Sequence, residues 1–181
     1  MKRRTKSFKV LKRKVIYRGR VAKLYLETIR WKDGQTFKRE IIDHPKSVVL
    51  LPLLSGNRIV LIRQFRAAVR KFIYEIPAGT TEPGETLLAC GKRELAEEIG
   101  YKATRYRLLS HFYPAPGIST EEMFLYKATG LTKLAHPPPQ DADEMITPVV
   151  VTVAKAKKMM ARGQIVDGKT ILGLTLGLRT R

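Results

Sequence analysis

The chain has little cysteine, little histidine and no long apolar run. Cys90 is the one cysteine among 181 residues, which excludes an intramolecular disulfide and favours a reducing, cytoplasmic compartment. Three scattered histidines and that cysteine make no zinc pattern. The longest nearly pure apolar run, residues 48–54, is broken by Pro52 and is far too short to span a bilayer. A metal would therefore need oxygen ligands, and no membrane partner is expected.

Acidic residues are also scarce, since 16 Asp and Glu face 35 Lys and Arg, a formal net charge of +19. Such an excess attracts polyanions over about 8 to 10 Å at ordinary salt, which fits either a generally basic surface or a nucleic-acid-binding protein. No acid precedes Glu27. The acids gather instead in one short segment, as Glu82, Glu85, Glu94, Glu97 and Glu98. A basic protein that concentrates its carboxylates in one place is expected to use them there.

Strand patterns dominate the chain. Residues 1–7 predict a basic, disordered tail, and residues 8–42 predict an N-terminal β segment with an Asp33-Gly34 hairpin turn. Residues 43–181 are expected to form the main domain. Its continuous apolar runs at 48–54 and 59–65 predict strands that are buried on both faces. Further strands are predicted at 105–112, 123–129 and 146–153.

Helices are fewer. Residues 87–99 form the clearest one, with Leu88, Leu95 and Ile99 on its apolar side and Gly100 placed to end it. Residues 154–161 predict a short helix, and residues 170–178 fit either a final helix or a terminal strand. The pattern predicts an α+β fold in which a mixed sheet packs between helices.

Three carboxylates share one face of the helix at 87–99. Residues three and four apart lie side by side on a helix, so Glu94, Glu97 and Glu98 project together. A solvated, glutamate-rich surface is the alternative, but Lys92 and Arg93 are expected to pair poorly with all three acids. Clustered carboxylate oxygens suit Mg²⁺, which shares its coordination sphere with waters and substrate phosphates. Over a diphosphate, such an ion neutralises charge and activates water.

The spacing of these residues resembles the signature of the Nudix hydrolases, which split nucleoside diphosphates linked to another group. The matching residues are Gly79-x5-Glu85-x7-Arg93-Glu94-Leu95-x-Glu97-Glu98-x-Gly100-Tyr101, with Tyr101 where the family usually has an aliphatic residue. The resemblance implies an α/β/α sandwich and catalytic roles for Arg93, Glu97 and Glu98. It also implies Mg²⁺, or Mn²⁺ in its place, held by Glu94, Glu97, Glu98 and the Ala78 carbonyl, with Glu85 orienting the helix or Arg93.

The flanking segments resemble the ADP-ribose pyrophosphatase group within that family. Residues 113–122 match the segment downstream of its signature, and Pro116 falls where the group has a distinguishing proline. The further matching segments are 39–42, 48–52, 62–66, 74–79 and 166–170. The resemblance implies hydrolysis of ADP-ribose to AMP and ribose 5-phosphate. It places Arg39 and Arg66 in contact with the substrate, and Glu121 in a substrate or metal loop; the alternative for each arginine is an ordinary surface position.

The proton acceptor stays open at this point. Glu144 matches a loop glutamate that reaches the metal in this group, whereas Ala142 stands where many members have a glutamate proposed as the base. Asp141, Asp143, Glu144 or Glu97 are the candidates to deprotonate water.

Other assignments of substrate and partner remain as alternatives. Residues 8–42 resemble the part that is exchanged across the dimer in the group, so a homodimer is expected. The alternatives are a pyrophosphatase for a GDP- or UDP-sugar and an RNA-associated Nudix protein. The intact signature and the lack of an aromatic-rich RNA-binding motif count against the last.

Overall fold

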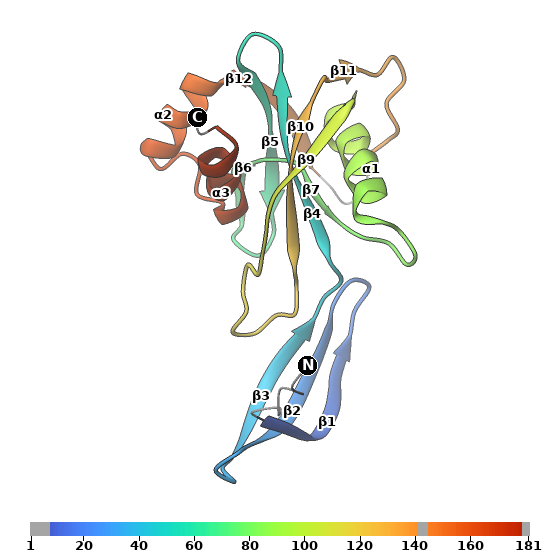
Figure 1. Cartoon of the computed structure of the whole chain (residues 1–181), viewed down its shortest axis with the longest axis vertical. Helices are drawn as coiled ribbons and strands as arrows, with labels where there is room; N and C mark the ends of the chain where they lie inside the picture. The colour runs from blue at the N-terminus through green and yellow to red at the C-terminus, as the bar shows by residue number, and fades with distance from the viewer. Residues whose placement is uncertain (1–7, 141–144, 179–181) are drawn as a thin grey trace, which may run out of the picture. The chain divides into compact units, whose positions relative to one another are not determined.

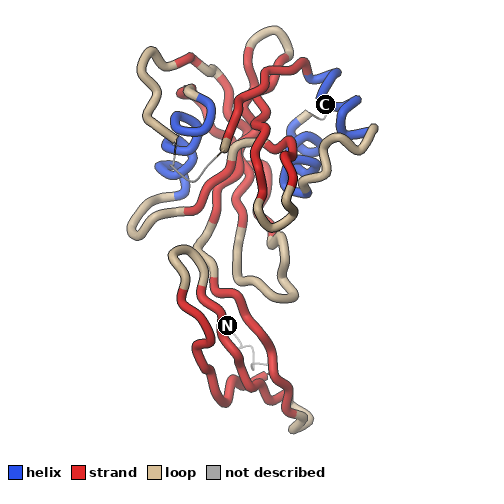
Figure 2. The backbone as a smooth tube through the Cα atoms, turned by 180° about the vertical axis from the view of Figure 1, so that it is seen from behind, coloured by secondary structure: helices blue, strands red, loops and turns tan. Residues whose placement is uncertain are grey.

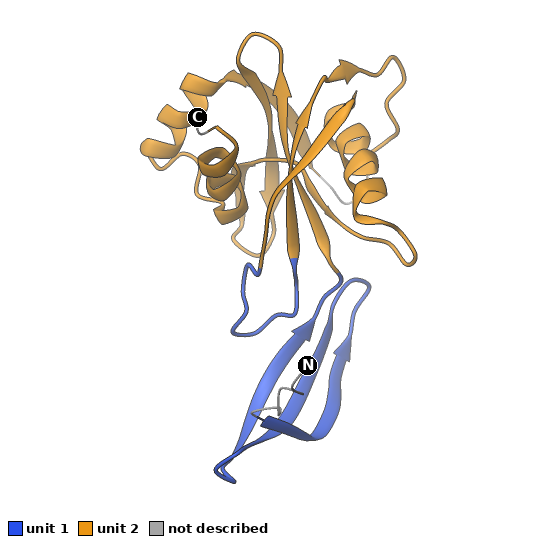
Figure 3. Ribbon diagram, viewed as in Figure 1, with its two compact units in different colours: residues 1–45, 113–122 blue, residues 46–112, 123–181 orange. Residues whose placement is uncertain are grey.

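The computed structural model describes residues 8–140 and 145–178. The chain divides into two compact units, Met1–Pro45 with Tyr113–Glu122 and Lys46–Phe112 with Met123–Arg181 (Figure 3). We refer to them as the small unit and the large unit. The expected tail at residues 1–7 lies outside the described residues.

The small unit contains a three-stranded antiparallel sheet. Strands β1 (Phe8–Arg18), β2 (Lys23–Trp31) and β3 (Thr36–Asp43) lie in that order. The predicted hairpin turn joins β2 to β3, and Gly34 has a φ of 87°, a conformation that an L side chain disfavours. The segment Tyr113–Glu122 joins this unit through two backbone bonds, from Ile42 N to Ile118 O (2.8 Å) and from Thr120 N to Ile42 O (2.9 Å).

The large unit is built on a mixed sheet, seen as the central strands in Figures 1 and 2. Its main path runs β12-β5-β4-β10-β9, and the β4–β10 pair is parallel while the other pairs are antiparallel. The bounds are β4 (Ser47–Leu54), β5 (Arg58–Arg66), β9 (Arg105–Phe112), β10 (Met123–Thr129) and β12 (Ile146–Thr152). Two short strands complete it, since β6 (Lys71–Glu75) pairs with β5 and β7 (Ala78–Thr80) pairs with β4. The strands β8 (Tyr101–Lys102) and β11 (Thr132–Lys133) pair with each other in a separate two-stranded sheet.

Helices cover both faces of this sheet. Helix α1 (Leu87–Ile99) lies on one face, and α2 (Val153–Ala161) and α3 (Gly168–Gly177) lie on the other (Figure 1). Alternate residues of β4 enter two separate cores, Val49 and Leu51 on the α3 side and Val48 and Leu50 on the α1 side. The predicted α+β sandwich with a separate small antiparallel sheet is therefore confirmed, as is the burial of β4 on both faces.

Two expectations about the helices were wrong or undecided. Leu88 is 41% exposed, so it does not belong to the apolar side of α1; Cys90 and Gly91 occupy that side instead. The segment at 170–178 belongs to a helix, because Asp167 caps it by accepting a hydrogen bond from Thr170 N. No helix in the described part of the chain is long and apolar enough to cross a membrane.

Candidate active site

The carboxylates of α1 lie against β7. Thr86 caps the start of α1 by accepting from Ala89 N (3.2 Å), and Gly100 ends the helix with a φ of 71°. Gly79 on β7 leaves room for the Glu94 side chain, because a Cβ at residue 79 would overlap the Glu94 carboxylate. The glycine at position 79 therefore has a steric cause in this chain: the strand must lack a side chain where the Glu94 carboxylate approaches it.

Two of the three helix carboxylates are buried. Glu94 is 8% exposed and Glu98 is 1% exposed. Glu98 Oε2 accepts a hydrogen bond from the Ala78 backbone N–H at 2.9 Å, so Ala78 and Glu98 are neighbours. Buried carboxylates cost desolvation energy unless they are paired, hydrogen-bonded or bound to a metal.

Arg93 gathers the other acids of the segment. It donates to both oxygens of Glu85 (3.0 and 3.1 Å), to Glu94 (2.7 Å), to Glu97 (3.1 Å) and to the Thr80 carbonyl (3.1 Å). The hydrogen bond to Glu85 is the main reason that the pKa of Arg93 is raised, and the same bond lowers the pKa of Glu85. The expectation that Arg93 pairs poorly with all three acids was thus wrong, because its side chain donates to both Glu94 and Glu97.

This donor set fits a hard divalent cation. Glu94 and Glu98 offer oxygens from a buried face of α1, and the Ala78 backbone is held beside Glu98 through its N–H. Within the described ranges no three acidic, histidine or cysteine side chains already converge in a metal-binding geometry. Arg93 holds Glu94 in this state, so a cation that binds Glu94 would share or displace that contact.

A second charged cluster, which the sequence pattern did not reveal, lies beside β6. Glu75 is fully buried and accepts two hydrogen bonds from Arg66, from Nε and Nη2, each at 2.7 Å. Lys169 also donates to Glu75 and forms an ion pair with Asp167 at 3.0 Å. Burial alone would raise the pKa of Glu75, but the hydrogen bond from Arg66 and the charge of Lys169 outweigh it and lower that pKa.

The first turn of α3 connects this charged cluster to the segment that precedes Gly79. Thr170 Oγ1 accepts from the Ile76 backbone N–H at 2.9 Å and donates to Asp167 Oδ2 at 2.5 Å. The backbone between β6 and β7 is therefore held at Ile76 by α3 and at Ala78 by Glu98 of α1. The segment 166–170 was the sequence signal that could have led to this cluster, because it resembles the ADP-ribose pyrophosphatase group, but its residues had no assigned role.

Arg66 belongs to this charged cluster. The bidentate contact with Glu75 raises its pKa, and Glu98 is near enough to raise it further by Coulomb attraction. Its side chain remains 40% exposed, on the same unit as the helix carboxylates.

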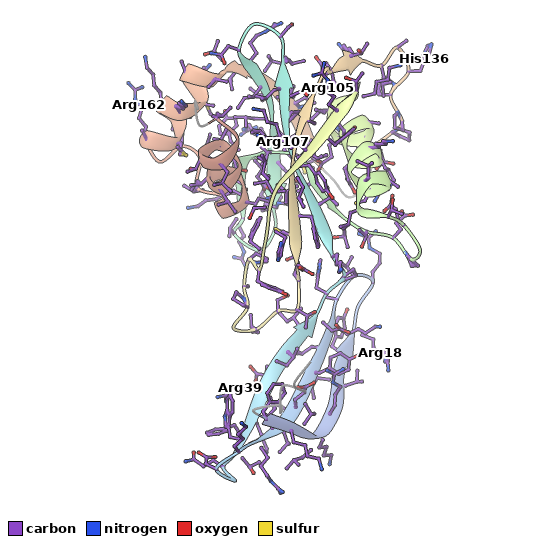
Figure 4. All side chains as sticks on the ribbon, viewed as in Figure 1. Arg18, Arg39, Arg105, Arg107, His136 and Arg162 are labelled. Atoms are coloured by element: carbon purple, nitrogen blue, oxygen red, sulfur yellow. The ribbon has the colours of Figure 1, made fainter. Side chains whose placement is uncertain are left out.

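The remaining predicted site residues lie elsewhere. Arg39, Pro116 and Glu121 belong to the small unit. Arg39 is exposed on β3, with Nη1 on the Lys38 carbonyl (2.9 Å) and its guanidinium over the Phe37 ring (Figure 4). Glu121 lies 3.7 Å from His44 Nδ1. Glu144, together with Asp141, Ala142 and Asp143, lies outside the described residues.

The large unit thus has a mixed sheet between helices, and its glutamate-bearing helix packs against Gly79 of β7. Residues 43–171 match the model of the NUDIX domain. The chain therefore belongs to the Nudix hydrolase family, which confirms the resemblance of its signature.

Individual relatives cover nearly the whole chain. It is 36% identical over 166 residues to a methanol dehydrogenase activator of Bacillus methanolicus, covering 92% of this chain and 90% of the relative. It is 34% identical over 162 residues to an ADP-ribose pyrophosphatase of Bacillus subtilis (strain 168), covering 90% and 88%. The crystal structure of an ADP compounds hydrolase superposes with a TM-score of 0.83 over 96% of this chain and 93% of that one, at 19% identity, and so shares the fold.

Proposed function

We propose that this enzyme hydrolyses the diphosphate of ADP-ribose, with Mg²⁺, to AMP and ribose 5-phosphate. The observation that carries the proposal is the pair of buried carboxylates, Glu94 and Glu98, facing the glycine strand within a surface of net charge +19. The similarity to an ADP-ribose pyrophosphatase over 90% of the chain supports the choice of substrate.

Glu94, Glu98 and the Ala78 carbonyl would hold the metal, with Glu97 contributing. A bound Mg²⁺ would neutralise the charge of the diphosphate and lower the pKa of the attacking water. Mn²⁺ would substitute, since it accepts the same oxygen ligands.

The chain's own residues then have separate tasks. Arg93 keeps Glu94 and Glu97 oriented, since it donates to both. Water attacks one phosphorus, the bond from that phosphorus to the bridging oxygen breaks, and the bridging oxygen leaves with the other phosphate. The water proton passes to a carboxylate, for which Glu97 and Glu144 are the candidates that we test below.

Substrate contacts are proposed for Arg39, Arg66, Pro116 and Glu121. The arginine fork suits phosphate oxygens, and in Arg66 the contact with Glu75 uses Nε and Nη2, so Nη1 remains as a donor for the substrate. Arg66→Lys would keep the charge but lose the bidentate contact, so we expect KM to rise.

The decisive test is Glu98→Gln with Glu82→Gln as its matched control. Glu82 precedes the helix, is exposed and lies in the same acidic segment. We expect Glu98→Gln to lower kcat by at least about 100-fold, about 2.7 kcal/mol, and the control to stay within twofold. Near-full activity of Glu98→Gln with Mg²⁺ in excess would refute the metal assignment.

Two further measurements separate the open choices. The first is kcat as a function of pH for Glu97→Gln and Glu144→Gln. The proton acceptor is the glutamate whose replacement removes the fall of kcat on the acidic side of the profile. Product analysis in ¹⁸O water shows which phosphorus is attacked, because the labelled oxygen appears in AMP or in ribose 5-phosphate.

A substrate panel tests the choice of ADP-ribose against GDP- and UDP-sugars. A kcat/KM for any other compound that exceeds the value for ADP-ribose would replace our proposed substrate.

We also propose a homodimer formed through residues 8–42. Exposed apolar side chains along β1, namely Phe8, Val10, Leu11, Val15, Ile16 and Tyr17, support this. Sedimentation at micromolar concentration should give about twice 20.6 kDa, and a mass near 20.6 kDa would contradict the dimer.

A further inference from the structure

The strands β8, β9, β10 and β11 and their connections in the large unit contain no acidic residue. The segments 101–112 and 123–140 have no Asp or Glu. They contain five cations, Lys102, Arg105, Arg107, Lys127 and Lys133. Because these strands carry positive charges and no negative ones, their own side chains attract anions.

Three of these cations line one cavity. It measures about 600 Å³ and is lined by Thr104, Arg105, Tyr106, Arg107, Lys127 and Thr129. Its volume falls within the range of small-molecule sites, about 300 to 1,000 Å³. We call it the cationic cavity. Figure 4 shows Arg105 and Arg107 along β9.

The strand register explains why these side chains gather. Arg107 pairs with Lys127 and Arg105 pairs with Thr129 across β9 and β10. Directly paired residues, and residues two apart on a strand, share one face of a sheet. The two arginines, the lysine and the threonine hydroxyl therefore lie on the same face.

This arrangement places like charges opposite each other, which destabilises a sheet unless something compensates. Lys127 Nζ donates to the Gly177 carbonyl at the end of α3 (3.0 Å), where the helix dipole is negative. Among the residues that the structure describes, Arg105 and Arg107 form no ion pair and both are exposed. Their guanidinium groups thus share the cavity lining with an anchored lysine and are accessible to an external acceptor.

We propose that the cationic cavity binds a ligand with consecutive phosphate groups. Arginine forks bind phosphate bidentately, and the hydroxyls of Thr104 and Thr129 add neutral donors. The cavity shares no residue with the carboxylate site, so this binding does not depend on the proposed hydrolysis. The ligand is either a free oligophosphate or the backbone of a single-stranded nucleic acid, which present the same chemistry.

The charges on β9 have an alternative explanation. β9 is an edge strand of the sheet, and charged side chains protect edge strands from aggregation. A charge-reversed variant separates this use from ligand binding. Arg105→Glu with Arg107→Glu keeps the edge charged but repels phosphate. Lys157→Glu with Arg162→Glu is the matched control: it changes the net charge equally, and both residues are exposed on or beside α2, away from the cavity lining.

The experiment measures binding of labelled tripolyphosphate and of a labelled 12-nucleotide single strand, each with EDTA and over a range of salt. In the β9 variant we expect Kd to rise at least tenfold for one or both probes, with less than a threefold change in the control. For the oligonucleotide, loss of two phosphate contacts lowers the slope of log K against log salt by about 1.4. The probe that is affected identifies the source of the phosphates.

Three results would overturn the proposal. The two variants could bind the probes equally weakly, which would show an effect of net charge alone. The β9 variant could bind them as tightly as the native protein, or the native protein could bind neither probe. Hydrolysis of ADP-ribose is measured in parallel and should stay within twofold in the β9 variant. A native protein that binds but does not hydrolyse would contradict the proposed function while leaving the cavity supported.

Discussion

Replacing Glu75 with glutamine tests the charged cluster beside β6. Glu75 is fully buried and is the common acceptor of Arg66 and Lys169, so the amide would leave two cations around a neutral group. Removing one partner of a buried ion pair costs about 3 to 5 kcal/mol. Arg66 is 40% exposed and regains water, and Lys169 keeps Asp167 at 3.0 Å, so we expect the lower end, about 3 kcal/mol.

The assay is urea unfolding at pH 7, together with thermal unfolding. For a chain of this size a loss of about 3 kcal/mol corresponds to a fall in Tm of roughly 6 to 12 °C. The exposed control Glu82→Gln should stay within about 0.5 kcal/mol. The double variant Glu75→Gln with Lys169→Met should lose less stability than the two single variants together. Lys169→Met removes the cation that Glu75→Gln leaves without its acceptor.

Acid should reduce the difference in the free energy of unfolding between the native protein and Glu75→Gln. The pKa of Glu75 is lowered in the folded state from its usual 4.5, so the ionised carboxylate stabilises the fold above about pH 4.5. That contribution is lost as the pH falls through the lower, folded pKa. Our reasoning about this cluster would be refuted if Glu75→Gln lost less than about 1 kcal/mol of stability at pH 7. It would also be refuted if the difference in stability between the variant and the native protein grew in acid.

Three further predictions follow from other contacts. Gly79→Ala should reduce activity at least tenfold, because the new methyl group occupies the space of the Glu94 carboxylate; activity within twofold of the native enzyme would contradict this. Thr170→Val should cost about 1 to 3 kcal/mol in urea unfolding, since it leaves the buried Ile76 N–H without its acceptor, and a neutral effect would show that this bond is dispensable. Cys90 should resist a thiol reagent at pH 8 until the protein unfolds, because burial raises the pKa of its thiol to about 12; rapid labelling of the folded protein would disprove this.

Local patterns were sufficient for most of the secondary structure. The predicted helix at 87–99 and the strands at 105–112 and 123–129 have the bounds that the structure shows. Caps and turns explain this success, because Gly100 and Asp33-Gly34 act through their own backbone conformations. Residues 170–178 could not be decided locally, since the contacts that favour a helix there come from elsewhere. A Cβ at Gly173 would lie 2.6 Å from Ile76 Cδ1 and a Cβ at Gly177 would lie 2.1 Å from Leu51 Cδ2, so these two glycines allow α3 to approach the sheet.

The same division applies to the site. Helical spacing alone placed Glu94, Glu97 and Glu98 on one face, because the period of a helix is independent of its surroundings. Spacing could not show that Arg93 reaches back to Glu85, eight residues earlier, since the loop between them determines that contact. It also could not show that Glu75 is buried between Arg66 and Lys169, which are 103 residues apart in the chain.

By itself the sequence determined the family, the carboxylate face and most of the longer strands and helices, because these depend on residue type and short-range spacing. Only the tertiary structure decided which carboxylates are buried, that α3 holds the backbone at Ile76, and that the cations of β9 and β10 line one cavity. Each of these features joins segments that are distant in the chain. Burial, ion pairing and strand register are properties of such neighbours in space, so they arise only when the sheet and its helices assemble.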